Sequence, residues 1–174
     1  LLEIFKKVLR RFPHATLHLV GDGPLRSEIE NLVVQHNLSS NIFFYGFQKD
    51  PLRWIEHADV LVLPSIIEGL PGVILEAFYC RTPVVANNTG GIKEIVVAGE
   101  TGHLIDLNND DAFANAIIKV VEQKEQTEKL VANAFQLVSN EYLNAQIAKR
   151  FLNVYKRLCP SENAELKKLP VTEL

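Results

Sequence analysis

Apolar and polar positions follow two alternating patterns along the first two thirds of the chain. Short apolar runs bounded by turn-forming residues are typical of buried strands, and apolar residues three or four positions apart are typical of amphipathic helices. The expected strands cover residues 15–20, 41–45, 60–63, 83–86 and 103–105. The expected helices cover residues 1–9, 25–36, 51–57, 71–78 and 92–97.

Strands that alternate with helices of this length predict an α/β fold, a Rossmann-like parallel sheet with helices on both faces. The run Val60–Leu63 is wholly apolar, so we expect this strand to be buried on both faces. After the last strand the pattern is helical only, with helices expected at 110–122, 125–139 and 141–158 and an end at Pro160.

Four loops begin where an expected strand stops: 21–24, 45–48, 64–72 and 87–91. Open parallel sheets bind ligands in the crevice at the carboxyl ends of their strands. These four loops therefore form the expected binding site.

Composition narrows the function. The length of 174 residues suits one sizeable core, and a net charge of −3 with mixed acids and bases gives no sign of a nucleic-acid-binding surface. No run approaches the roughly 20 apolar residues of a membrane span. Cys80 and Cys159 lack metal-ligand spacing and the five histidines form no cluster, so we expect free thiols, a cytoplasmic location and no metal or other cofactor.

Two carboxylates bracket the start of the helix expected at Pro71. Glu68 precedes it in a loop, and Glu76 lies a little more than one turn inside it. The free N–H groups of a first helical turn attract anions, and carboxylates accept hydrogen bonds from sugar hydroxyls. A phosphate between hydroxyl-bearing groups fits this layout, which describes a sugar nucleotide.

Each of these features also has a simpler interpretation. Glu76 and Glu94 both complement a helix dipole without binding anything. Gly21-Asp22-Gly23 lacks the third glycine of the dinucleotide fingerprint and is followed at once by Pro24, so a plain tight turn is the alternative there.

Taken together, the residues form an ordered series. It runs through Leu19 to Pro24, Phe44 to Phe47, Leu63-Pro64-Ser65, Glu68-Gly69, Glu76-Ala77, Cys80, Thr82 to Val85, Gly90-Gly91, Glu94 to Val96, and Gly99 to Gly102. This series closely resembles the C-terminal donor-binding domain of glycosyltransferase family 4, whose members have the GT-B fold and retain anomeric configuration. The family signature of two glutamates separated by seven residues corresponds to Glu68 and Glu76.

The resemblance implies a role for each loop. Glu68 is expected to be the catalytic residue that holds hydroxyls of the donor sugar, and Glu76 to hold the ribose diol, while amides near Leu70 to Val73 face the diphosphate. The remaining expected donor-binding residues are Gly21, Gly23, Tyr45, Gly46, Phe47, Ser65, Gly69, Leu70, Gly72, Val73, Gly90 and Gly91. The donor is a UDP- or GDP-sugar, and the base is left open because the family reads it mainly through main-chain groups.

The resemblance also implies that parts of the protein lie outside this chain. Residues 1–158 correspond to the donor domain without its first strand, and 159–174 to a tail. The loop that supplies an arginine and a lysine to the diphosphate, and the N-terminal domain that binds a glycan or lipid-linked acceptor, are not in the sequence. We therefore expect this fragment alone to be inactive, and the whole protein to transfer a hexosyl group in cell-surface polysaccharide synthesis, in the cytoplasm or peripherally at the inner face of the membrane. Apolar residues near Phe151 or Tyr155 are expected to be exposed.

Two departures from the family pattern stand out. Arg81 and Pro71 occupy positions that are often glycine in the family. Two other functions stay open: a GT-B-like sugar-nucleotide epimerase and a noncatalytic nucleotide-sugar-binding module.

Overall fold

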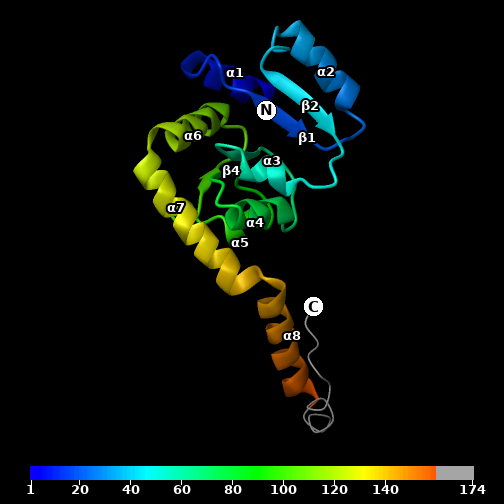
Figure 1. Ribbon diagram of the computed structural model, residues 1–174, viewed down its shortest axis with the longest axis vertical. Coiled ribbons are helices and arrows are strands. Elements are labelled where there is room, and N and C mark those ends of the chain that lie inside the picture. Colours follow the sequence, from blue (N-terminus) through cyan, green and yellow to red (C-terminus); the bar gives the residue numbers. More distant parts are fainter. Residues whose placement is uncertain (160–174) are drawn as a thin grey trace. The chain divides into compact units, whose positions relative to one another are not determined.

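The structure, a computed structural model, describes residues 1–159 (Figure 1). Its strands are β1 (Leu17–Val20), β2 (Ile42–Gly46), β3 (Leu61–Leu63), β4 (Val84–Asn87) and β5 (His103–Ile105). Its α-helices are α1 (Leu2–Arg11), α2 (Arg26–Gln35), α3 (Leu52–Glu56), α4 (Gly72–Tyr79), α5 (Ile92–Ile95), α6 (Asp110–Glu122), α7 (Lys124–Leu137) and α8 (Asn144–Leu158). The chain divides into a compact first unit, Leu1–Gln136, and a second unit that begins at Leu137.

All strand pairs are parallel, as predicted, but they form two ladders rather than one continuous sheet. One ladder joins β1 to β2, starting with Leu17 opposite Ile42. The other has the order β3-β4-β5, with Val62 opposite Val85 and Ala86 opposite Leu104. In the part of the chain that the structure describes, one edge of β1 and one edge of β3 therefore carry no strand partner.

Both ladders nevertheless share one hydrophobic core with α1 and α6. Buried residues from the two helices and from both ladders belong to a single cluster that includes Ile4, Phe5, Val8, Leu17, Ile42, Val85, Phe113, Ile117 and Val120. Ion pairs between Lys7 and Asp111 (2.6 Å) and between Arg11 and Glu122 (2.5 Å) link the two helices at the surface. One hydrophobic core therefore joins the two ladders within the first unit.

Burial differs sharply between β3 and β4, although both sequences are apolar. Every residue of β4 is buried, whereas Leu61, Val62 and Leu63 of β3 are only partly buried. The prediction that Val60–Leu63 is buried on both faces is therefore wrong. The physical reason is position in the ladder, because β4 lies between two strands, whereas within residues 1–159 β3 pairs with β4 alone.

Most predicted elements are present, and their ends shift by a few residues. Pro71 is not a first-turn residue as predicted but the residue before α4, with extended backbone angles (φ −73°, ψ 113°). The helix expected at 125–139 is α7 followed by a π-helical turn at Val138–Tyr142, and the one expected from residue 141 begins at Asn144.

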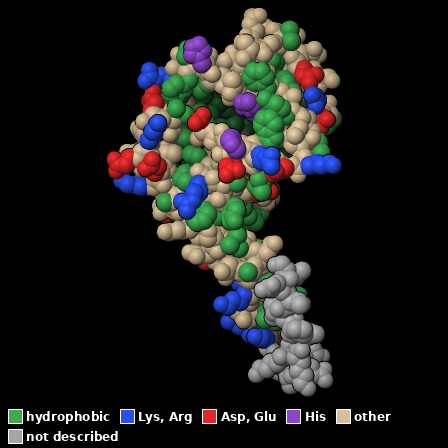
Figure 2. Space-filling model, viewed as in Figure 1, with side chains coloured by type: hydrophobic (Ala, Val, Ile, Leu, Met, Phe, Trp, Pro, Cys, Tyr) green, Lys and Arg blue, Asp and Glu red, His purple; other side chains and the backbone are tan. Residues whose placement is uncertain are grey.

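Up to Cys159, the second unit contains that π-helical turn and α8, which are joined by an ion pair between Glu141 and Arg150. No residue of α8 is buried. Phe151 and Tyr155 are each 58% exposed, which confirms the expectation for this helix. Figure 2 shows basic side chains gathered over this part of the surface. Helix α8 ends at Leu158, as predicted, whereas Pro160 and nearly all of the expected tail, 159–174, lie outside the described residues.

Candidate functional site

The loops after β3 and β4 are bonded to each other by side-chain and main-chain hydrogen bonds. Asn87 Nδ2 donates to the carbonyl of Ser65 (3.2 Å), and Thr89 Oγ1 donates to the carbonyl of Ile66 (2.9 Å). The Gly91 amide donates to the carbonyl of Gly69 (2.9 Å). The structure thereby unites Ser65, Gly69 and Gly91, three of the predicted site residues, at the carboxyl end of the second ladder.

Gly90 and Gly91 lie directly against the loop that carries Glu68. A Cβ atom on Gly90 would overlap the carbonyl of Glu68, and one on Gly91 would overlap the carbonyl of Gly69. The resemblance placed both glycines among the expected donor-binding residues. The structure gives them a contact of another kind, because they allow one loop backbone to pass close to the other.

Helix α4 begins beside this loop pair with free amide donors. Pro71, the residue just before the helix, makes no side-chain capping bond. Gly72, Gly69 and Leu70 are exposed, and Leu70 keeps 50% of its surface accessible. The first N–H groups of a helix lack partners within the helix, and they carry its positive dipole end. This helix start is therefore open to an anionic ligand.

Glu68 and Glu76 flank that helix start and are both partly buried. Within the described residues neither carboxylate has a hydrogen bond or an ion pair with another side chain. Burial, with further contributions from the charges of Glu56 and Glu76, raises the pKa of the nearby Cys80 thiol. Two partly buried acids without basic partners remain available to accept hydrogen bonds from a ligand.

The ends of β1 and β2 form a second group of predicted site residues. The Gly21 amide donates to the carbonyl of Gly46 (2.8 Å). Both residues have positive φ, 129° for Gly21 and 63° for Gly46, in the region that favours glycine. Phe47, which follows at once, is 79% exposed, so this strand end presents an aromatic ring to solvent.

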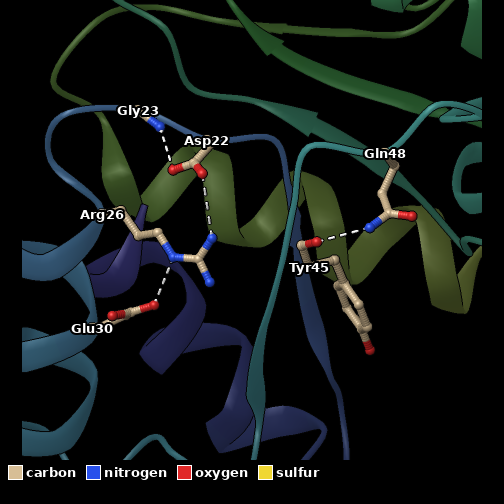
Figure 3. A network of polar contacts seen from close by, with 6 residues as sticks. All are labelled: Asp22, Gly23, Arg26, Glu30, Tyr45 and Gln48. Carbon is tan, nitrogen blue, oxygen red and sulfur yellow. Dashed lines mark hydrogen bonds and ion pairs between the residues drawn. The ribbon is translucent and has the colours of Figure 1, made fainter.

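Side-chain hydrogen bonds and ion pairs stabilise the two loops of this second group (Figure 3). Asp22 Oδ1 accepts a hydrogen bond from the Gly23 amide (2.8 Å), and Gln48 Nε2 donates to the carbonyl of Tyr45 (2.8 Å). Arg26 of α2 bonds Glu30 (2.8 Å) and lies 3.6 Å from Asp22. Arg26 was not among the predicted site residues, although Asp22, Arg26 and Glu30 are spaced four apart, a spacing typical of ion pairs on one helix face.

The predicted site residues therefore fall into two groups, each at the carboxyl end of its own ladder. Two cavities of about 250 and 310 Å³ lie elsewhere in the first unit, and neither is lined by a predicted donor-binding residue. The first is bordered by His103, whose pKa is lowered by burial and then by the charge of Lys119. Among residues 1–159 no cluster of three or more metal-ligating side chains is present, and no helix is long and apolar enough to cross a membrane.

Sequence comparison shows that the chain is similar to glycosyltransferases. An uncharacterized glycosyltransferase of Methanocaldococcus jannaschii is 34% identical over 158 residues, which are 90% of this chain and 40% of the relative. The UDP-Gal:alpha-D-GlcNAc-diphosphoundecaprenol alpha-1,3-galactosyltransferase of Escherichia coli is 32% identical over 133 residues, 72% of this chain and 34% of the relative. The chain thus spans less than half the length of these relatives.

Solved structures share the fold. Sucrose-phosphate synthase from Thermosynechococcus elongatus matches with a TM-score of 0.80 and 29% identity over 92% of this chain and 42% of its own. Anabaena HepE in complex with UDP matches with a TM-score of 0.80 and 26% identity over 89% of this chain and 44% of its own. The α/β fold predicted from the sequence is confirmed as that of GT-B glycosyltransferase chains.

Residues 1–137 match the family described as glycosyl transferases group 1. That range contains both loop groups and the start of α4 with its two flanking carboxylates. The chain therefore belongs to the glycosyl transferase group 1 family.

Proposed function

We propose that this chain is the donor-binding part of a retaining glycosyltransferase of family 4. The whole protein transfers a hexosyl group from a nucleotide-diphosphate sugar to a glycan or lipid-linked acceptor. The observation that carries the proposal is the pair of partly buried, unpaired carboxylates, Glu68 and Glu76, on either side of the open start of α4.

Each group at this helix start has a separate task. Amides of Leu70, Gly72 and Val73 bind the donor diphosphate and stabilise the charge that develops on it as the glycosidic bond breaks. Glu68 accepts hydrogen bonds from the sugar hydroxyls, and Glu76 accepts them from the ribose diol. This chemistry is electrostatic positioning, so Glu68 orients the donor rather than attacking it.

The loops after β1 and β2 bind the nucleoside. Gly21 and Gly23 allow the backbone to approach the donor closely, and the chain at Tyr45, Gly46 and Phe47 meets the base. We propose UDP-sugar as the donor, because the name of the Escherichia coli relative specifies UDP-Gal and structures of the similar Anabaena protein hold UDP and UDP-glucose.

Titration calorimetry on the whole protein tests the two glutamates separately. Glu76→Gln should weaken binding of UDP and of UDP-sugar alike, by about tenfold, since a hydrogen bond to a charged group contributes about 1.5–3 kcal/mol. Glu68→Gln should weaken the binding of UDP-sugar and leave the binding of UDP unchanged. Exposed Glu94, in the short helix α5, gives the matched control Glu94→Gln. Equal losses for UDP and UDP-sugar in the Glu68 variant would reject the sugar contact.

We propose further that a strand supplied by residues preceding Leu1 lies between β1 and β3. It would pair the free edge of β1 and the free edge of β3 and give the order β2-β1-new strand-β3-β4-β5, the order of the doubly wound dinucleotide-binding fold. Unpaired strand edges expose N–H and C=O groups, so amides of β1 and β3 should exchange with solvent much more slowly in the longer protein than in residues 1–174. Equal exchange rates in the two would reject the insertion.

The same proposal assigns the acceptor to a further domain of the whole protein. It also places that protein in the cytoplasm, where a lipid-linked acceptor at the inner face of the membrane would bring it into peripheral contact with lipid.

A further inference from the structure

Arg26 is half-buried behind the two loops that follow β1 and β2, at the start of α2. Its Nε bonds Glu30 Oε1 at 2.8 Å, and its Nη1 lies 3.6 Å from Asp22 Oδ2 (Figure 3). Because Asp22 also accepts the Gly23 amide (2.8 Å), Arg26 is connected to the loop after β1 through one side chain.

Arg26 also lies against the end of β2. A Cβ atom built on Gly46 would stand 3.1 Å from Arg26 Nη1, so the guanidinium packs directly on this strand end. Gly46 is itself bonded to Gly21 through the Gly21 amide (2.8 Å). One guanidinium thus contacts Asp22, in the loop after β1, and Gly46, at the end of β2.

The charge of Arg26 is already compensated by its neighbours. Two carboxylates, Asp22 and Glu30, surround one guanidinium, and the hydrogen bond to Glu30 is the main cause that raises the pKa of Arg26. An arginine that binds a phosphate directly presents its fork of donors to the ligand. Here Nε is engaged by Glu30, and Nη1 lies between Asp22 and Gly46.

We propose that Arg26 is a positioning residue that sets the relative placement of the loops 21–24 and 45–48, and so determines how tightly and how selectively the nucleoside of the donor is held. The inference rests on the proposed function of these loops. Arg26 is expected to affect how the base and ribose are bound rather than how the diphosphate is bound.

The test uses the whole protein with Arg26→Gln and the conservative Arg26→Lys. The first readout is hydrogen exchange of the Gly21 amide without ligand, which should become at least about tenfold faster in Arg26→Gln if the two strand ends separate. The second is binding of uridine, UDP and GDP. Arg26→Gln should weaken the binding of uridine and of UDP by the same factor, about tenfold. It should also reduce the difference in affinity between UDP and GDP. Arg26→Lys keeps the positive charge but lacks the planar guanidinium, so it should weaken binding less than Arg26→Gln does.

Lys129→Gln is the matched control, because Lys129 forms a similar ion pair with Glu125 at a spacing of four on an exposed helix face (2.8 Å). It should change neither readout. If Arg26→Gln does not fold, Asp22→Asn removes one partner of the guanidinium and should give the same two effects at smaller size.

The outcomes separate this inference from the proposed function. A wild-type protein that binds none of the three ligands rejects the nucleoside role of the loops, whatever Arg26 does. Wild-type binding with unchanged Gly21 exchange and unchanged affinity in Arg26→Gln overturns the role of Arg26 alone. Weaker binding of UDP with unchanged binding of uridine in Arg26→Gln also overturns the positioning role, because that result identifies Arg26 as a direct phosphate ligand.

Discussion

Arg81 shows how a single residue can combine strain with a compensating contact. Its φ of 60° lies in the left-handed region, and its guanidinium stands 3.9 Å from the centre of the Phe135 ring. The left-handed conformation costs a residue with a Cβ about 1–2 kcal/mol, and a cation–π contact contributes about 0.5–1 kcal/mol at an exposed site. The ring contact offsets part of the backbone cost and ties the turn after α4 to α7.

These two effects can be separated by substitution. Arg81→Ala loses the ring contact and keeps the strain, so it should lower the free energy of unfolding by about 0.5–1 kcal/mol. Arg81→Gly loses the contact and relieves the strain, so it should be about 1 kcal/mol more stable than the alanine variant. Urea unfolding measures both. Equal stability of the two variants would show that the backbone at this position is not strained.

His103 should make stability depend on pH. Burial, and then the charge of Lys119, lowers the pKa of His103, so the unfolded chain binds the proton more readily than the folded one. The contribution of neutral His103 to the free energy of unfolding should therefore be fully present above the pKa of histidine in the unfolded chain, about 6.5. It should be lost as the pH falls below that value towards the pKa of His103 in the folded protein.

Urea unfolding at a series of pH values, from about 7.5 down to 5.5, measures this dependence across the unfolded pKa. The loss on acidification should be smaller in His103→Gln than in the wild type, and His14→Gln, at an exposed position, serves as control. An identical pH dependence in wild type and His103→Gln would exclude the effect.

At the level of elements, the site depends on how closely two loops approach. The loop after β4 meets the loop after β3 through Gly90 and Gly91, where no Cβ fits. Gly91 has φ outside the positive region, so the requirement for glycine there is steric and not conformational. The position of Glu68 therefore depends on a residue more than twenty positions away in the sequence.

Gly91→Ala should push these loops apart. The overlap with the Gly69 carbonyl should destabilise the protein by about 1–3 kcal/mol, as overpacking does, and should weaken UDP-sugar binding by displacing Glu68. Gly69→Ala is the matched control for stability alone, because a Cβ there meets nothing within 4 Å, whereas Gly69 is itself a predicted donor-binding residue. Thermal unfolding and calorimetry measure the two effects, and a Gly91 variant as stable as the control would contradict the packing argument.

At the scale of the whole molecule, stability and the candidate site both lie in the first unit. The shared core and both loop groups fall within Leu1–Gln136. Helix α8 contributes no buried residue, so its apolar side chains add little to folding. Phe151 and Tyr155 of this helix are each 58% exposed.

Removal of residues 144–174 should therefore leave one cooperative unfolding transition. The midpoint should move by no more than about 2 °C, since surface changes usually stay within about 0.5 kcal/mol. Calorimetry of the truncated and intact chains measures this. A broad transition, or a large fall in the midpoint, would show that α8 supports the core.

The sequence by itself determined the α/β class, the order of elements and the loops at the carboxyl ends of the strands. These follow from local patterns, because apolar periodicity records which side of each segment avoids water. It also determined that Glu68 and Glu76 flank one helix start, since both are set by spacing along a single segment. The helix after α7 was less well predicted, because a π-helical turn has no strong sequence pattern.

Only the tertiary structure decided which segments meet. The partial exposure of β3, the division into two ladders and the contact of Arg26 with Gly46 each depend on residues far apart in the chain. An apolar run has the same pattern at the edge of a ladder as at its centre, and a glycine looks the same whether it faces a ligand or another loop. The sequence therefore specified the chemistry of the site residues, and the packing of distant segments specified their neighbours.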